Sequence, residues 1–134
     1  MRRHPYEDLL HLLRRPQQYT GGEWGSVTRP GLPRVTLVYP DTYELGMSNF
    51  GLAVLRHVLL QTGRFDVRRA FMPAPDLDAM MDERGLPWVD LEAGDPVFES
   101  RVVAFGLPAE ALYSNFLRLL RHAGIPLLAR DRSG

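Results

Sequence analysis

The sequence predicts an α/β protein with a parallel sheet of the Rossmann-like or flavodoxin-like kind. Short apolar runs rich in β-branched residues alternate with longer amphipathic segments, and glycine or proline lies at most of the junctions. The chain has 134 residues, enough for a single hydrophobic core. We expect a strand order of about 3-2-1-4-5, in which the sheet grows outward from the first strand in both directions.

The first part of the chain is expected to precede this sheet. The apolar side chains of residues 5–14 fall at helical spacing between two prolines, which predicts a short amphipathic helix. Residues 16–33 are rich in glycine, proline, glutamine and threonine, which predicts an irregular connector. The sequence therefore suggests an N-terminal helix and connector over residues 1–33 and an α/β domain over residues 34–134.

The first strand-helix-strand unit has the clearest pattern. Residues 34–39 form a nearly continuous apolar run, typical of a parallel strand buried on both faces. A polar loop over residues 40–49 leads to a helix over residues 50–61, which Gly63 is expected to end. Residues 65–72 read as the second strand.

The alternation continues to the end of the sequence. The remaining predicted elements are a helix capped by Asp76 and ended by Gly85, a short strand over 88–91, a strongly apolar strand over 101–106, a helix over 111–123 and a strand over 125–129. Such an alternation implies helices on both faces of the sheet.

Composition excludes several classes of chemistry. The chain has no cysteine, so it offers no thiolate for catalysis, zinc or an iron-sulfur cluster. All basic residues are arginine, which excludes a Schiff-base lysine and a P-loop lysine. Acidic and basic residues balance to a net charge of zero without a basic stripe, so we expect no nucleic-acid binding. The all-arginine usage is typical of a GC-rich genome or a thermophile.

The sequence also indicates where in the cell the protein is located. No apolar run approaches the roughly 18 residues of a membrane span, and the N-terminus lacks a signal-peptide pattern. We therefore expect a cytoplasmic protein.

Ligands of such sheets bind where the strand order reverses, at the carboxyl ends of the flanking strands. The loops 41–49 and 107–115 follow the two most apolar strands, so the candidate side chains lie there. The amides of the helix after residue 49, with Ser48 and Asn49, could cradle a polar group, or the two side chains could simply cap that helix. Asp41, Glu44 and Glu110 could approach this point and serve as acid and base, or be solvated acids at helix starts. The four histidines show no ligand spacing, so no metal site is expected.

The sequence D-T-Y-E-L-G at residues 41–46 resembles the D-x-H-x-x-G loop of cobalamin-binding domains. More closely, residues 16–23, 39–49 and 106–126 are similar to the N-terminal domain of a family of cobalamin-domain-containing radical S-adenosylmethionine (SAM) proteins. The string P-D-x-Y-E-x-G-M-S-N is the specific part of this resemblance. The resemblance as a whole covers almost the entire chain.

The resemblance implies a cobalamin-binding-like fold and an accessory domain without catalysis of its own, in a parent protein that is a radical SAM enzyme. The implied cofactor is cobalamin. The implied partner is the radical SAM barrel domain of the same protein or of a neighbouring chain. The cofactor-binding positions that it implies are Asp41, Tyr43, Glu44, Gly46, Ser48, Asn49, Gly106 and Glu110.

Two departures from the family pattern weaken the cobalamin assignment. Tyr43 stands where the family has the histidine that binds cobalt, and Pro108 stands where a serine would bond the nucleotide tail. The family also continues into a further strand and a cluster-binding barrel, so we interpret the chain as a fragment. The alternative is an interaction or structural module that has lost cobalamin binding. A third interpretation is an independent enzyme. Separately, an unpaired sheet edge at residues 125–129 would recruit partners, so we expect self-association.

Overall fold

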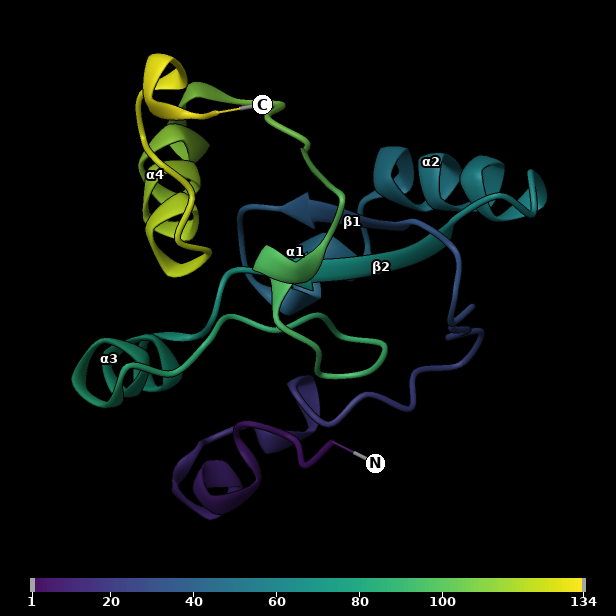
Figure 1. Ribbon diagram of the computed structural model, residues 1–134. Helices are drawn as coiled ribbons and strands as arrows, with labels where there is room; N and C mark the ends of the chain where they lie inside the picture. Colours follow the sequence, from purple (N-terminus) through teal and green to yellow (C-terminus); the bar gives the residue numbers. More distant parts are fainter. Residues whose placement is uncertain (1, 134) are drawn as a thin grey trace.

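The structure is a computed structural model that describes residues 2–133. It contains a three-stranded parallel sheet in the order β2-β1-β3, with helices packed on it (Figure 1). The strands are β1 (Arg34–Tyr39), β2 (Asp66–Phe71) and β3 (Val102–Phe105). The predicted α/β class and the parallel neighbourhood of the two most apolar strands are confirmed. The five-strand order is not found, because residues 88–91 and 125–129 form no strand of this sheet.

β1 is central because it can be covered on both faces. Val35 and Leu37 belong to one buried cluster and Val38 to the other. Thr36 is also fully buried, and its hydroxyl shares a hydrogen bond of 2.6 Å with the Ser100 hydroxyl. The polar side chain in this strand is therefore satisfied inside the protein.

The helices divide between the two faces of the sheet. The α-helices are α1 (Tyr43–Met47), α2 (Phe50–Gln61), α3 (Pro75–Arg84) and α4 (Tyr113–His122). The 3₁₀ turns are η1 (Glu7–Leu12), η2 (Pro16–Gln18), η3 (Val97–Glu99), η4 (Glu110–Leu112) and η5 (Ala129–Asp131). Leu52 of α2 packs with one cluster, whereas Leu77 of α3 and Leu119 of α4 pack with the other. None of the helices in residues 2–133 is long and apolar enough to span a membrane.

Several helix predictions need correction in detail. The bounds of α2 and the left-handed Gly85 that ends α3 are as expected (φ 63°). The helix predicted over residues 5–14 is instead the 3₁₀ turn η1. Asp76 does not cap α3; Ala74 holds the cap position and Pro75 begins the helix. The Asp76 carboxylate instead accepts the Arg14 amide at 2.9 Å, which ties the N-terminal residues to α3.

The N-terminal residues pack into the main core. The Tyr6 ring is buried, and its hydroxyl donates to the Pro87 carbonyl at 2.6 Å. Leu13 joins the same cluster as Val38 of β1. Further along, the Ala74 amide donates to the Tyr19 hydroxyl at 2.9 Å. We call residues 5–26 the N-terminal segment; its contacts place it across the carboxyl ends of β1 and β2.

The stretch predicted as a short strand at residues 88–91 closes the outer edge of β2. Its only β-type contact in the described chain is an isolated antiparallel bridge between Val89 and Pro96. The Leu91 amide donates to the Arg69 carbonyl at 2.8 Å, and the Trp88 indole donates to the Phe71 carbonyl at 3.0 Å. We call residues 88–95 the edge segment. It bonds the outward-facing amide and carbonyl of Arg69 and the carbonyl of Phe71 without adding a strand.

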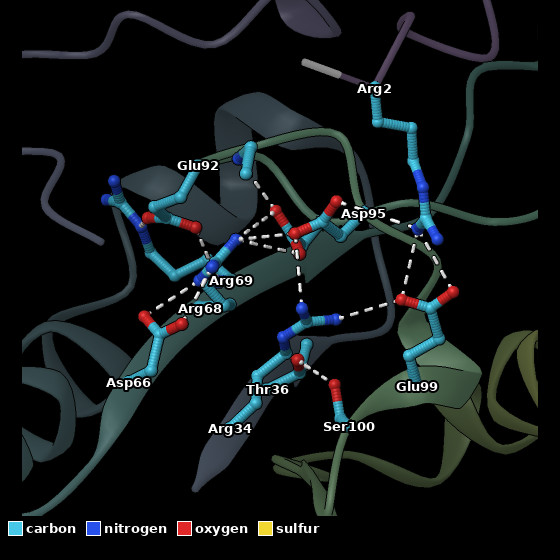
Figure 2. Close-up of polar contacts among 12 residues, drawn as sticks. Arg2, Arg34, Thr36, Asp66, Arg68, Arg69, Glu92, Asp95, Glu99 and Ser100 are labelled. Carbon is cyan, nitrogen blue, oxygen red and sulfur yellow. Dashed lines mark hydrogen bonds and ion pairs between the residues drawn. The ribbon is translucent and has the colours of Figure 1, made fainter. Parts of the chain in front are cut away.

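Buried charges hold the edge segment in place (Figure 2). The Arg68 guanidinium lies 2.7 Å from Asp66, 3.2 Å from Asp90 and 3.5 Å from Asp95. The next residue, Arg69, bonds the fully buried Glu92 at 2.7 Å. Charges taken out of water are tolerated only when they are paired and hydrogen-bonded, as these are.

The last predicted strand is a turn. Ile125 packs against the core, and after it the chain passes Pro126 and the 3₁₀ turn η5. The Arg132 guanidinium donates to the Pro126 carbonyl at 2.8 Å, which folds this stretch back on itself. Among residues 2–133, the strand without an outer neighbour is therefore β3, and the open edge expected at residues 125–129 is not found.

The Asp90 carboxyl gives the charge network a measurable pH dependence. Burial raises the pKa of Asp90 from 3.8 to about 6, against the opposing effect of Arg68. Because the folded protein keeps this proton at a pH where the unfolded chain releases it, the Asp90 contribution to stability should increase as pH falls. We predict a gain of about 1 kcal/mol between about pH 7 and pH 5.

The measurement is urea unfolding of wild type and Asp90→Asn at both pH values. The asparagine oxygen can still accept the Ala93 amide, which the carboxylate accepts at 2.8 Å. The difference between the two proteins also cancels His4, whose pKa is lowered by burial. Identical pH dependence in both proteins would contradict the prediction.

Candidate functional site

Two hollows open at the carboxyl ends of the strands. The N-terminal cleft, of about 560 Å³, is lined by Arg14, Arg15, Gln18, Tyr19, Thr42, Tyr43, Glu44, Met72, Ala74, Pro75 and Asp76. The switch-point groove, of about 440 Å³, is lined by Tyr39, Asn49, Gly51, Leu52, Leu55, Ala104, Phe105, Gly106, Leu107 and Pro108. Both volumes fall in the range of roughly 300 to 1,000 Å³ that is usual for small-molecule sites.

The switch-point groove lies where the sheet topology reverses. β2 lies on one side of β1 and β3 on the other, and the helices that follow β1 and β3, α2 and α4, pack on opposite faces of the sheet. α2 forms one wall and the loop after β3 forms the opposite wall. Leu55 and Leu107 are 45 % and 36 % exposed, so the groove is an accessible and largely apolar surface.

Tyr43 and Glu44 begin α1 and face the N-terminal segment. The Tyr43 hydroxyl donates to the Glu23 carboxylate; burial and this carboxylate raise the pKa of Tyr43 to about 12. Glu44 accepts hydrogen bonds from Gln18, at 2.7 Å, and from Arg15. The Glu44 backbone amide, together with Arg15, lowers the pKa of the Glu44 carboxyl. Both side chains therefore hold the N-terminal segment against α1.

Three other predicted positions support the backbone of α1 and its flanks. The Asp41 carboxylate accepts the Thr42 amide at 2.7 Å. The Ser48 hydroxyl donates to the Glu44 carbonyl at 2.8 Å, at the end of α1. Gly46 is buried; a Cβ atom there would lie 2.1 Å from the Phe71 ring. Gly46 therefore permits the close approach of α1 to β2.

The remaining predicted positions lie on the other side of β1. The Asn49 side chain accepts the Leu52 amide at 2.8 Å and caps α2, which agrees with the capping alternative. The Gly106 amide donates to the Val38 carbonyl at 2.9 Å. Glu110 is exposed in η4. The structure thus brings Asn49 and Gly106 together in the groove and separates them from Tyr43 and Glu44 in the cleft.

The N-terminal segment supplies side chains that the sequence analysis did not select. Gln18 is almost fully buried and lines the cleft, while Glu23 and Arg15 bond the two side chains at the start of α1. The only signal in the sequence was the resemblance of residues 16–23 to the family. No group of three or more histidine, aspartate or glutamate side chains within residues 2–133 is placed to hold a metal ion.

Comparison with known proteins decides the family. The model of the N-terminal region of radical SAM proteins matches residues 51–134, which is more than half of the chain. The chain belongs to this family. The match includes α2, β3 and the groove residues from Gly51 to Pro108, but it does not include the loop 41–49. Neither the curated proteins nor the solved structures yield a match. Membership identifies an accessory N-terminal domain of a radical SAM protein.

The close approach at Gly46 makes a testable contribution to stability. Gly46→Ala should lower the free energy of unfolding by about 1 to 3 kcal/mol, because the added methyl group forces the buried Phe71 ring to move. The matched control is Gly51→Ala in α2, where the nearest atom to a Cβ is the Asn49 amide oxygen at 3.4 Å. Chemical denaturation of both variants checks this; equal stability of the two would contradict it.

Proposed function

We propose that this chain is a non-catalytic accessory domain that forms an apolar wall of the substrate cleft in a radical SAM protein, and that its own side chains do not hold a corrinoid. Family membership supports the accessory role. The observation that carries the rest of the proposal is the surface of α2, which is apolar on nearly every side although only one side is packed.

The polar groups near the expected corrinoid position are already engaged. The Tyr43 phenol remains protonated at neutral pH and donates to Glu23, so it is a poor ligand for cobalt. Ser48 and Asn49 bond helix backbone, and the carboxylate of Glu44 bonds the N-terminal segment. The residues present therefore do not fit a corrinoid held by a protein ligand, and we derive no reaction step through one.

The apolar face of α2 supports docking instead. Phe50, Val54 and Val58 follow one another at intervals of four residues and are 82 %, 44 % and 52 % exposed. An amphipathic surface helix would carry polar side chains on this stripe. Large exposed apolar patches mark interaction surfaces, and this one adjoins the switch-point groove through Leu55. The catalytic partner is expected to cover the stripe and to place its substrate at the groove.

A cobalamin titration tests whether the side chains of this domain hold a corrinoid. We expect that hydroxocobalamin added to wild type or to Tyr43→Phe shows the absorption spectrum of the free corrinoid, because no side chain is available to replace its lower ligand. The thermal midpoints of the two proteins are the control for folding. A spectral shift in wild type that Tyr43→Phe abolishes at unchanged thermal stability would show that the phenol is a ligand.

The role as a wall of the substrate cleft is tested on a protein that combines this domain with the radical SAM catalytic domain. Leu55→Glu places a charge in the groove and should raise KM for the substrate at least about tenfold, with little change in the iron-sulfur absorbance. The matched control is Leu45→Glu on α1, where the leucine is 52 % exposed but does not line the groove. Equal kinetics for both variants would contradict the cleft assignment while leaving family membership untouched.

A further inference from the structure

The inner end of the N-terminal cleft has polar groups that the chain itself leaves free. Gln18 is only 9 % exposed; its side-chain nitrogen donates to Glu44 at 2.7 Å, but its carbonyl oxygen accepts no hydrogen bond within residues 2–133. The Tyr19 hydroxyl accepts the Ala74 amide at 2.9 Å, and its own proton has no acceptor in the same part of the chain. Buried polar groups normally have partners, so the cleft offers an acceptor and a donor to a ligand.

Two carboxylates border the same end of the cleft. The Glu44 carboxylate, which accepts bonds from Gln18 and Arg15, is part of the lining. Asp76 lines the cleft from the first turn of α3. Burial raises the pKa of Tyr19, and the negative charges of Asp76 and Glu44 raise it further, so both carboxylates lie near the phenol oxygen. Negative charge beside a free acceptor favours a cationic donor over a neutral one.

The mouth of the cleft carries positive charge. Arg14 and Arg15 both line it and are exposed. The Arg15 guanidinium pairs with Glu44, whereas the Arg14 guanidinium makes no hydrogen bond or ion pair within residues 2–133. The Arg14 amide donates to Asp76 at 2.9 Å, which anchors this residue beside the cleft. A guanidinium matches the geometry of a carboxylate, so Arg14 is suited to bind an acidic group of a ligand.

The rest of the lining is mostly apolar. It consists of Met72, Ala74, Pro75, the side chain of Thr42 and the ring of Tyr43. Such a surface favours contact with an aliphatic group. The switch-point groove, by contrast, has no charged residue in its lining. The N-terminal cleft therefore combines a negative inner end, a free cation at its mouth and an apolar wall, within a volume of about 560 Å³.

We propose that the N-terminal cleft binds a free α-amino acid with an apolar side chain, held as the zwitterion. The ammonium group donates to the Gln18 carbonyl oxygen, and the charges of Glu44 and Asp76 balance it. The carboxylate accepts hydrogen bonds from Arg14, and the side chain lies against Met72. Only free groups are used, so the N-terminal segment keeps its present bonds. The inference does not depend on the proposed function, because it rests on this cleft and not on the switch-point groove.

Isothermal titration calorimetry at neutral pH tests the need for both charged ends. L-Leucine is the probe; 4-methylpentanoate lacks its ammonium group and 3-methylbutylamine lacks its carboxylate. We expect L-leucine to bind, and each analogue to bind at least about tenfold more weakly, because each leaves one charged end of the cleft unmatched. Absence of L-leucine binding at millimolar concentration, or equal affinity for all three compounds, overturns the proposal.

A variant at the mouth of the cleft locates the site. Arg14→Gln removes a guanidinium that makes no bond in the described chain, so the fold is retained. It should weaken L-leucine binding at least about tenfold and leave the binding of 3-methylbutylamine unchanged. The matched control is Arg64→Gln, at another exposed arginine that lies outside the cleft. L-Leucine binding that both variants change equally overturns the assignment.

A variant at the inner end provides the reciprocal measurement. Glu44→Gln removes the negative charge but keeps the Oε1 atom that accepts the bonds from Arg15 and Gln18. It should weaken the binding of L-leucine and of 3-methylbutylamine, but not that of 4-methylpentanoate. Equal thermal midpoints of wild type and variant control for folding. Unchanged affinity for L-leucine would show that its ammonium group lies elsewhere, which also overturns the proposal.

Discussion

The adjacent arginines of β2 are the constraint on which the arrangement of the sheet depends. Consecutive side chains on a strand point to opposite faces, so Arg68 and Arg69 place guanidinium groups on both sides of β2. Each is at least nine-tenths buried and each has carboxylate partners in the edge segment, Asp90 and Asp95 for Arg68, in addition to Asp66 of β2, and Glu92 for Arg69. Removing the segment would leave the buried Arg69 without its carboxylate partner, at a cost of several kcal/mol.

The closed edge of β2 determines where the rest of the molecule is open. The edge segment occupies the outer side of β2, so this side of the sheet is closed by the chain itself. The N-terminal segment covers the carboxyl ends of β1 and β2, bonded through Gln18 to Glu44 and through Tyr19 to α3. The gap between β1 and β3 receives no such cover. One accessible groove therefore coincides with the topological switch point, while the opening beside β2 is bordered by the N-terminal segment and forms the N-terminal cleft.

The sequence allowed the central elements to be predicted because their signals are local. The apolar runs of β1 and β3 and the bounds of α2 follow from residue patterns within a single element. Trp88 and Leu91 have the apolar pattern of strand residues, but in the structure they only pack into the two buried clusters. Their neighbours Asp90 and Glu92 form ion pairs with arginines some twenty positions earlier in the chain. No local pattern reports such a pairing. The capping role of Asn49 was foreseeable as an alternative, whereas the bond between Tyr43 and Glu23 joins residues that the sequence assigned to separate regions.

In the loop after β1, positions that the resemblance implies for cofactor binding make structural contacts. The family resemblance places a cofactor ligand at Tyr43, yet its hydroxyl bonds Glu23, and the adjacent Glu44 bonds Arg15 and Gln18. A cofactor that bonded these two side chains would compete for them with the N-terminal segment, which the buried Tyr6 ring also anchors in the core. Loss of the present bonds would leave the Glu23 and Glu44 carboxylates without these partners. The contacts that complete the core thus occupy the polar side chains of this loop, which supports our proposal that the domain acts through the apolar side of α2.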